Sequence, residues 1–282
     1  MSLLAGLIGN TVAEPAGEFA AILGASPSRG ARSPSLWNAA YAAAGSAARM
    51  VPLDVATDRL AAVVAALKAD LRFRGGAVTM PLKQEILPLL DRVEPEAQRI
   101  GAVNALYRDG SALIGANTDG AGALADILDL CPDLDRRRVL VLGVGGAGLA
   151  VAAFLAGRAA ALSVWNRSPA RAMGLGYALA APDAQGLAGT DLLVNCTAAG
   201  HASGPAEAAF DTALLAHMPA GAAVYDVIYQ PAETALLAAA RQRGLATRNG
   251  LGMNRLQAVI AFQKANPGLL PADRIEAAMA AA

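Results

Sequence analysis

The chain has 282 residues, of which 55% are hydrophobic and only 4% aromatic, and its formal net charge is zero. This composition predicts a core of Ala, Leu and Val side chains, in one large domain or two ordinary ones. The zero net charge, without a basic patch or polybasic tail, argues against nucleic acid or an anionic membrane as the main partner.

Signals for metal binding and for secretion are weak. Cys131 and Cys196 lack metal-ligand spacing, and we expect both to act as small apolar residues. His201 and His217 are the only histidines, so we predict no metal site. The start, MSLLAGLIGN, lacks the basic region of a signal peptide, which favours a cytoplasmic protein.

The first part of the chain is predicted to alternate strands and helices. Residues 19–24 (FAAILG) predict a strand, and Ser33 is placed to cap a helix over residues 34–44. The turn signal Arg108-Asp109-Gly110 predicts a hairpin. Strands are predicted at 50–55, 77–80, 103–107 and 112–116, and helices at 57–70, 84–90 and from Asn117 to about 130.

The most informative pattern lies between residues 136 and 171. An apolar strand (139–142) is followed by a glycine-rich turn, an apolar helix ending at Gly157, and a second strand (161–165). This βαβ unit is typical of dinucleotide binding, because the glycines let the backbone approach the pyrophosphate at the N-terminus of the helix. The alternative interpretation, a single helix that spans a membrane, is disfavoured because the glycines would destabilise such a helix. They are Gly143, Gly145, Gly146 and Gly148.

The residues after the second strand predict the cofactor. A site for NAD usually places Asp or Glu there to bond the ribose 2′-hydroxyl. This chain instead has Asn166, Arg167, Ser168 and Arg171, of which the arginines can pair with a 2′-phosphate and the serine can donate to it. The alternative to a phosphate-binding role is that these residues form only a solvated surface turn. We predict that they bind the 2′-phosphate and that the cofactor is NADP.

The remainder of the chain continues the alternation. Strands are predicted at 191–196 and 223–228, and helices at 232–243, 253–265 and 271–280. Strands that alternate with helices predict an α/β fold with parallel sheets.

Short motifs in a fixed order carry a family resemblance. They are VTMPLK (78–83), IGAVNAL (100–106), NTDG (117–120), LGVGGAG (142–148), NRSPAR (166–171), YDVIYQPAETALL (225–237) and NGLGMNRLQ (249–257). With these motifs the chain resembles the shikimate/quinate dehydrogenase family, from about Phe19 to its last helix. GLIGN (6–10) also resembles the family's first strand, but residues 19–24 are preferred because they keep the loop to Ser33 short.

The resemblance implies two domains. An N-terminal α/β substrate-binding domain would comprise residues 1–118 and 252–282, because the family's C-terminal helices return to the first domain. A Rossmann-type dinucleotide-binding domain would comprise residues 119–251.

The resemblance also assigns catalytic roles. Lys83 matches the family's catalytic lysine and Asp119 the acid beside it. Oxidation of a secondary alcohol needs a group that takes up the hydroxyl proton, which a lysine can do while a neighbouring carboxylate holds it in position. Outside this motif, a lone lysine such as Lys83 is usually a solvated residue at a helix start.

Other matching positions are polar residues suited to a polyhydroxylated ring carboxylate. The substrate contacts implied by the resemblance are Ser33, Thr79, Asn104, Tyr229 and Gln257. Thr197 and Gly250 match positions near the cofactor.

The chain departs from the family mainly around the substrate. The family's HSxSP loop carries two serines for the substrate carboxylate, whereas RGARSP keeps only Ser33, so that Arg29 or Arg32 is left to meet the carboxylate. Ala77 and Ala116 stand where the family has polar residues. We expect these alanines to make the substrate pocket larger or more apolar.

The predicted function is that of an NADP-dependent dehydrogenase that interconverts shikimate, or a related ring acid such as quinate, with its 3-dehydro ketone. A relative acting on a different ring, for example an amino-substituted one, is the nearest alternative. A non-catalytic NADP sensor is the alternative from another class, and the presence of both Lys83 and Asp119 argues against it. The expected partner is a small-molecule ring carboxylate, and the protein is expected to be a monomer or homodimer.

Overall fold

The computed structural model describes residues 4–13, 15–202 and 204–282. These residues form two compact units, one containing the chain up to Thr118 together with Gln257–Ala282, the other Asp119–Leu256. The chain returns to the first unit within helix α9 (Leu251–Ala265), at Gln257 rather than at residue 252.

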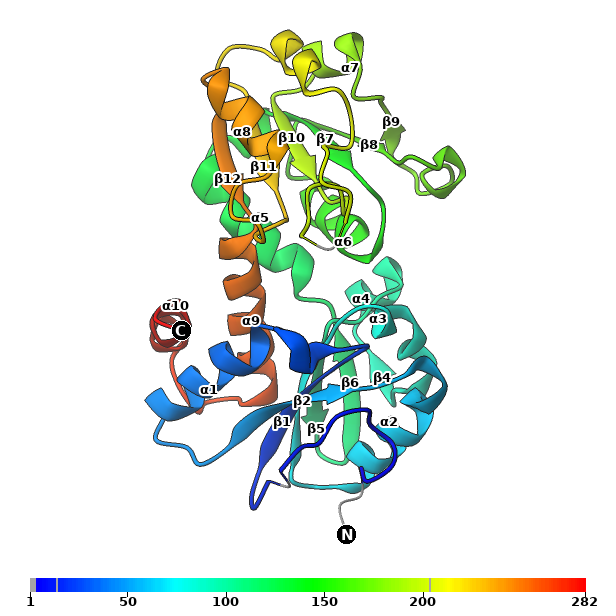
Figure 1. Cartoon of the computed structure of the whole chain (residues 1–282), viewed down its shortest axis with the longest axis vertical. Helices are drawn as coiled ribbons and strands as arrows, with labels where there is room; N and C mark the ends of the chain where they lie inside the picture. The colour runs from blue at the N-terminus through cyan, green and yellow to red at the C-terminus, as the bar shows by residue number, and fades with distance from the viewer. Residues whose placement is uncertain (1–3, 14, 203) are drawn as a thin grey trace. The chain divides into compact units, whose positions relative to one another are not determined.

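A six-stranded mixed sheet forms the first unit, in the order β2-β1-β3-β5-β6-β4 (Figure 1). Strand β1 pairs in parallel with β2 and β3, whereas β5 runs antiparallel to β3 and β6. The predicted hairpin thus inserts two antiparallel pairs into an otherwise parallel sheet. The strands are β1 (Phe19–Gly24), β2 (Arg49–Asp54), β3 (Phe73–Val78), β4 (Arg92–Val93), β5 (Ala105–Asp109) and β6 (Ala112–Ala116).

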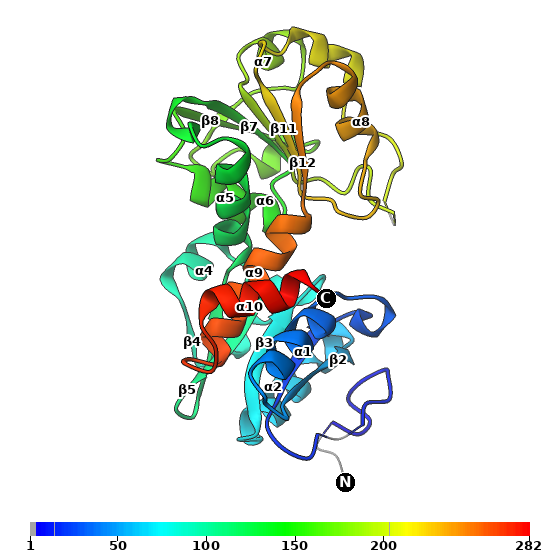
Figure 2. The ribbon, with the colours of Figure 1, turned by 90° about the vertical axis from the view of Figure 1, so that its left-hand side faces the viewer.

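Helices cover both faces of this sheet. On one face, α1 (Ser33–Ala43), the later part of α9 and α10 (Ala272–Ala280) pack around Trp37, Tyr41 and Phe262. The ring centroid of Phe262 lies 5.1 Å from that of Trp37 and 4.9 Å from that of Tyr41, and Figure 2 shows α10 beside α1. The other face is covered by α2 (Leu60–Ala69), α3 (Leu82–Glu85) and α4 (Pro95–Ile100).

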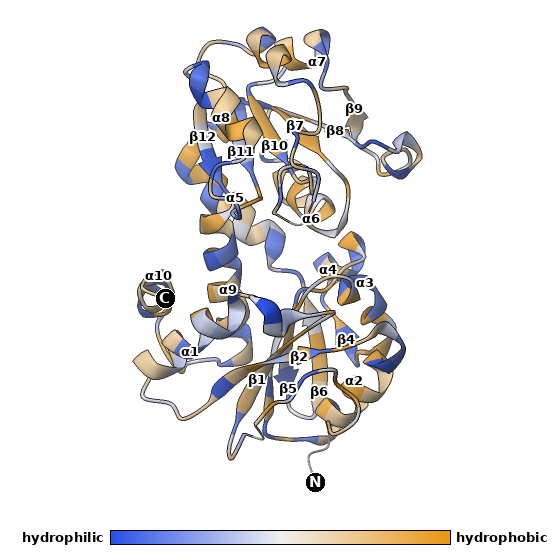
Figure 3. Cartoon of the chain, in the orientation of Figure 1, coloured by the Kyte–Doolittle hydropathy of each residue, from blue (hydrophilic) through white to orange (hydrophobic). Residues whose placement is uncertain are grey.

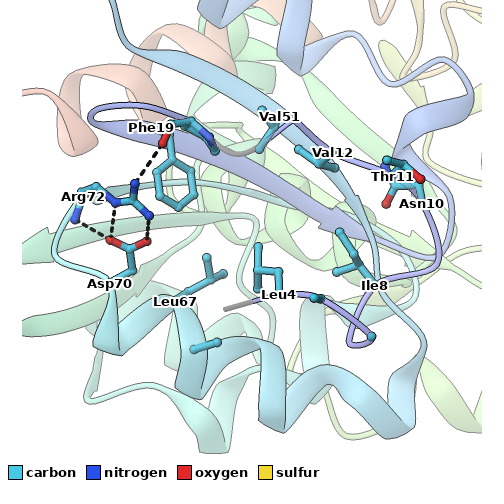
Figure 4. A pocket seen from close by; sticks show the side chains of 14 residues that line it. Leu4, Ile8, Asn10, Thr11, Val12, Phe19, Val51, Leu67, Asp70 and Arg72 are labelled. Atoms are coloured by element: carbon cyan, nitrogen blue, oxygen red, sulfur yellow. Dashed lines mark hydrogen bonds and ion pairs between the residues drawn. The ribbon is translucent and has the colours of Figure 1, made fainter. Parts of the chain in front are cut away.

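The N-terminal segment, residues 4–13, contacts the outer edge of β2. Gly9 N donates to the Asp54 carbonyl at 2.7 Å, and the Asn10 side chain donates to the Pro52 carbonyl and accepts from Asp54 N. These bonds occupy groups that an unpaired edge strand would otherwise expose. Between this segment and α2 lies a pocket of about 290 Å³, lined mainly by apolar side chains and by the Asp70–Arg72 ion pair (Figure 4).

The second unit contains a fully parallel six-stranded sheet in the order β12-β11-β10-β7-β8-β9. Counted along the chain, the order is 3-2-1-4-5-6 from the β9 edge, which is the order of dinucleotide-binding folds. The central strands β7 and β10 are strongly hydrophobic (Figure 3), as expected of strands buried on both faces. The strands are β7 (Arg138–Leu142), β8 (Ala161–Trp165), β9 (Ala178–Leu179), β10 (Leu192–Asn195), β11 (Ala223–Asp226) and β12 (Ala246–Asn249).

Two helical layers complete the second unit. On one face α5 (Asp119–Leu130) and α6 (Gly146–Leu155) pack through residues such as Ile127 and Val151. On the other, α7 (Ala184–Ala188) and α8 (Ala235–Gln242) pack with Leu187, Leu236 and Leu237 inward.

Most predicted elements are confirmed, including the strand at residues 19–24, but several details differ. Ser33 is the first residue of α1 and makes no capping bond, because the N-cap is Arg32. The strand predicted at 77–80 is β3, which ends at Val78, before Pro81. The helix predicted at 84–90 is divided into α3 and a 3-10 turn that contains Pro88. No helix within the described part of the chain is long and apolar enough to cross a bilayer.

Candidate functional site

In the first unit, a buried polar cluster lies where β5 begins and β6 ends. Asn104 Nδ2 donates to Thr118 Oγ1 at 3.0 Å and to Gln257 Oε1 at 3.2 Å, and Asn104 Oδ1 accepts from Thr118 N at 2.7 Å. Asn104 is 3% exposed and Thr118 is fully buried. The structure therefore brings together two predicted substrate residues, and it adds Thr118, which lies inside the NTDG motif but was assigned no role.

The other predicted substrate residues of this unit lie on neighbouring loops. Thr79 directly follows β3 and donates its N–H to the Leu23 carbonyl at 2.8 Å, which fixes it beside the end of β1. Ser33 is buried at the start of α1. Both positions follow the carboxyl ends of parallel strands, where α/β folds bind their ligands.

Lys83 is the second residue of α3 and is half-buried. Its carbonyl accepts the N–H of Val103 at 2.8 Å, so α3 is tied to the loop that carries Asn104. Asp119, buried, is the first residue of α5 and follows Thr118 directly. Lys83 and Asp119 belong to different units, and their pairing stays a prediction.

In the second unit, the glycine-rich turn joins β7 to α6. Gly143 has φ +89° and donates its N–H to the Trp165 carbonyl at 2.7 Å. A Cβ atom on Gly148 would overlap with the Gly143 carbonyl, whereas a Cβ on Gly145 would meet open space. Gly146 is the first residue of α6. The turn is therefore tight at Gly143, closely packed at Gly148 and open at Gly145, as a pyrophosphate requires.

The turn after β8 is tied to the same loop. Asn166 Oδ1 accepts from Val144 N at 3.3 Å, and Asn166 Nδ2 donates to the Ser168 carbonyl at 3.0 Å. Arg167, Ser168 and Arg171 are exposed. Beside them is a mainly apolar pocket of about 260 Å³. Its lining is Val164, Trp165, Asn166, Pro169, Ala172 and Leu179–Ala181.

A second polar network fixes the loops after β10 and β11. Asp226, fully buried, accepts from Asn195 Nδ2 at 2.9 Å, from Thr234 Oγ1 at 2.7 Å and from Ile228 N at 3.1 Å. Asn195 in turn accepts from Thr197 Oγ1 at 2.7 Å. Burial outweighs these donors and raises the pKa of Asp226.

This network positions three predicted residues. It bonds Thr197 directly, it holds Ile228 next to Tyr229, and the Ile228 carbonyl accepts the N–H of Gly250 at 3.1 Å. The network itself was not predicted from the sequence. Its only signal is a polar residue at the end of each of two buried strands, Asn195 and Asp226.

The cysteines are both free thiols. Burial raises the pKa of each, as expected for small packed residues. Across residues 4–13, 15–202 and 204–282, no group of three His, Cys, Asp or Glu side chains is placed to hold a metal ion.

The comparisons with known proteins agree with one another. The family model for the shikimate dehydrogenase substrate binding domain matches residues 23–106. The shikimate dehydrogenase (NADP(+)) of Citrifermentans bemidjiense is 42% identical, over 88% of this chain and 90% of that protein.

The chain belongs to the shikimate dehydrogenase family.

Solved structures extend the likeness to the whole fold. Shikimate 5-dehydrogenase from Thermus thermophilus, in complex with NADP(H) and shikimate, has a TM-score of 0.82 and 32% identity, over 94% of this chain and 99% of that chain. Quinate dehydrogenase from Corynebacterium glutamicum, in complex with NAD, has a TM-score of 0.78 and 30% identity, over 94% and 99%.

The residues named above as departing from the family pattern all lie in the first unit. Ala77 and Ala116 are 7% and 0% exposed and belong to the apolar cluster with Ala105 and Ala258, so these alanines contribute packing. Arg29 is exposed, whereas Arg32 is half-buried and its Nη1 atom is buried. Of the two arginines, Arg32 is the one beside Ser33 with a buried terminal nitrogen.

Proposed function

We propose that this chain catalyses the NADP-dependent interconversion of shikimate, or a related ring hydroxy acid such as quinate, and its 3-dehydro ketone. The observation that carries the proposal is the hydrogen-bonded cluster of Asn104, Thr118 and Gln257, which lies at the strand ends of a unit that belongs to this family. Amide and hydroxyl groups held in this way suit a ring that bears several hydroxyl groups.

The second unit fits NADP. The tight turn at Gly143 and the open space at Gly145 leave room for a pyrophosphate at the N-terminus of α6. The apolar pocket beside Trp165 suits a flat adenine. The exposed Arg167, Ser168 and Arg171 lie in the adjoining turn, and we assign them to the 2′-phosphate. No carboxylate is present in this turn to repel that phosphate or to bond a free 2′-hydroxyl.

The chemistry assigned to the chain's own residues is proton handling and orientation. NADP, when bound, supplies the acceptor for the hydride that leaves the carbinol carbon. The neutral Lys83 amine takes the hydroxyl proton as the ketone forms, and the resulting ammonium returns it in the reverse reaction. Asp119 holds the Lys83 side chain in place through both steps. We assign Ser33, Thr79, Asn104, Tyr229 and Gln257 to the ring, and Thr197 and Gly250 to the nicotinamide end.

Arg32 is the residue we assign to the substrate carboxylate together with Ser33. Arginine matches a carboxylate with parallel N–H donors, so it can replace the serine hydroxyl that the family has in this loop. A ring acid with a differently placed or amino substituent is the alternative substrate. We also propose that the protein works in the cytoplasm as a monomer or homodimer.

The test is a panel assay. Purified protein is mixed with NADP or NAD and with shikimate, quinate or an amino-substituted analogue, and reduced nucleotide is followed by absorbance. Reduction of NADP with shikimate or quinate supports the proposal. Nucleotide binding without turnover on any ring acid would favour the sensor alternative.

A further inference from the structure

Asp126 is a buried carboxylate to which the proposed reaction gives no role. Asp126, on α5, is 1% exposed. Its Oδ2 accepts from Tyr225 Oη at 2.7 Å and from Met253 N at 2.9 Å, and its Oδ1 lies 3.0 Å from Arg248 Nε. Arg248 Nη1 also donates to the Asp126 carbonyl at 3.0 Å. One carboxylate therefore joins α5, β11, β12 and the first turn of α9.

The contact with α9 is unusually close. The first N–H groups of a helix have no partner within it, and Asp126 accepts one of them, from Met253. A Cβ atom on Gly252 would overlap with the Asp126 carboxylate, so only glycine allows the helix to approach this far. A negative charge at the N-terminus of a helix is also favourable. The carboxylate thus fixes both the rotation of α9 and its distance from α5.

These two helices carry residues with proposed roles. Helix α5 begins at Asp119, which we assign to the proton. Gly250, assigned to the nicotinamide end, directly precedes α9, and Gln257, assigned to the ring, lies further along the same helix. The chain passes between the two units twice, once at the start of α5, between Thr118 and Asp119, and once within α9, between Leu256 and Gln257. A shift of α9 against α5 would therefore move Gly250 relative to Asp119.

We propose that Asp126 is a positioning residue for hydride transfer, acting through α9 on the geometry of the nicotinamide end. This inference rests on the proposed function. The hydrogen bonds and ion pair of the Asp126 carboxylate described above go to Tyr225, Met253 and Arg248, which we assign neither to the substrate nor to the cofactor. We therefore expect its loss to leave the turn at 166–171 intact. Its removal therefore lowers the rate of the chemical step far more than it lowers the affinity for NADPH.

The first test is Asp126→Asn, which has nearly the same shape but no charge to hold Arg248. A misplacement of about 1 Å in a reacting group costs on the order of 10²-fold in rate, so we expect kcat to fall by about 10- to 100-fold. The dissociation constant of NADPH, measured by its fluorescence, should stay close to that of the wild type. Asp129→Asn is the matched control, because Asp129 lies on the same helix, 3.5 Å from the same Arg248, but is exposed; it should leave kcat unchanged.

A second pair of variants tests the contact with α9. Gly252→Ala should lower kcat as Asp126→Asn does, because the new methyl group pushes α9 away. In an Asp126→Ala background that methyl group has room, so Gly252→Ala should then add little. If Asp126→Asn does not fold, Gly252→Ala and Tyr225→Phe supply the same comparison.

The outcomes distinguish a failure of the positioning role of Asp126 from a failure of the proposed function. Wild-type kcat in Asp126→Asn, or effects of Asp126→Ala and Gly252→Ala that simply add, would overturn the positioning role. A loss of thermal stability with unchanged kcat would show a merely structural role and would overturn it as well. A wild-type protein that turns over none of the ring acids would instead refute the proposed function.

Discussion

Replacing Asn104 by alanine tests whether the polar cluster of the first unit supports the fold as well as the site. The change removes the acceptor for Thr118 N–H in a fully buried residue, which costs about 1–3 kcal/mol. It also removes the bonds from Asn104 Nδ2 to Thr118 and Gln257, each worth about 0.5–1.5 kcal/mol. We expect the free energy of unfolding of this unit to fall by about 2–6 kcal/mol.

Tryptophan fluorescence can isolate the first unit. Trp37 is fully buried in the first unit and Trp165 lies in the second, so a Trp165→Phe background leaves Trp37 as the reporter. With an m value of about 2 kcal/mol/M in urea, a loss of this size should move the urea midpoint down by about 1–3 M.

A milder variant, Thr118→Val, separates the contribution of the Thr118 hydroxyl from that of the Thr118 backbone bond. Thr118→Val keeps the backbone bond to Asn104 and removes only the hydroxyl, so it should cost about 0.5–1.5 kcal/mol. An Asn104→Ala midpoint equal to that of the background protein, or a larger effect from Thr118→Val, would refute this account of the cluster.

The remaining predictions concern catalysis, cofactor choice and pH. Lys83→Ala should lower kcat on the order of 10²–10⁴-fold with little change in substrate KM, and near-full turnover in steady-state assays would remove Lys83 from the mechanism. Arg167→Asp should shift the ratio of kcat/KM values from NADP toward NAD, because the carboxylate repels the 2′-phosphate and can bond a free 2′-hydroxyl; an unchanged ratio would contradict our interpretation of the turn. Burial raises the pKa of Asp226, so its contribution to stability is present at low pH and lost as pH rises above the usual carboxyl value of 3.8. In denaturant titrations, wild-type stability relative to Asp226→Asn should therefore decline with rising pH, and a constant difference would argue against the raised pKa.

Local patterns were enough to predict the main elements of both units. The βαβ unit around the glycine-rich turn was predictable because apolar strands, glycines and an apolar helix each leave a local pattern, and β7, α6 and β8 all lie there. Strand β12, Ala246–Asn249, was missed because it is an edge strand with polar residues and no apolar run. The 3-10 turn over Thr212–His217 was missed because so short an element has no periodicity to detect.

Contacts between distant residues were beyond sequence reasoning. Asn195, Asp226 and Thr234 form one network, yet each alone is an ordinary polar residue, and only the pairing of β10 with β11 brings the first two together. The same holds for Asp126, which meets Tyr225, Arg248 and Met253 from three other elements. The sequence also could not show that Ala77 and Ala116 pack in one apolar cluster, because they lie on different strands; the larger or more apolar substrate pocket stays a prediction.

The most direct test of the central claim is hydride transfer itself. Shikimate carries deuterium at C3, the carbinol carbon that becomes the 3-dehydro ketone. It is incubated with the enzyme and equimolar NADP and NAD, and the reduced nucleotides are analysed by mass spectrometry. We predict that deuterium appears in NADPH, at least about tenfold more than in NADH, because Arg167 and Arg171 lose charged partners when the 2′-phosphate is absent. Deuterium in neither nucleotide, or equally in both, would contradict the account.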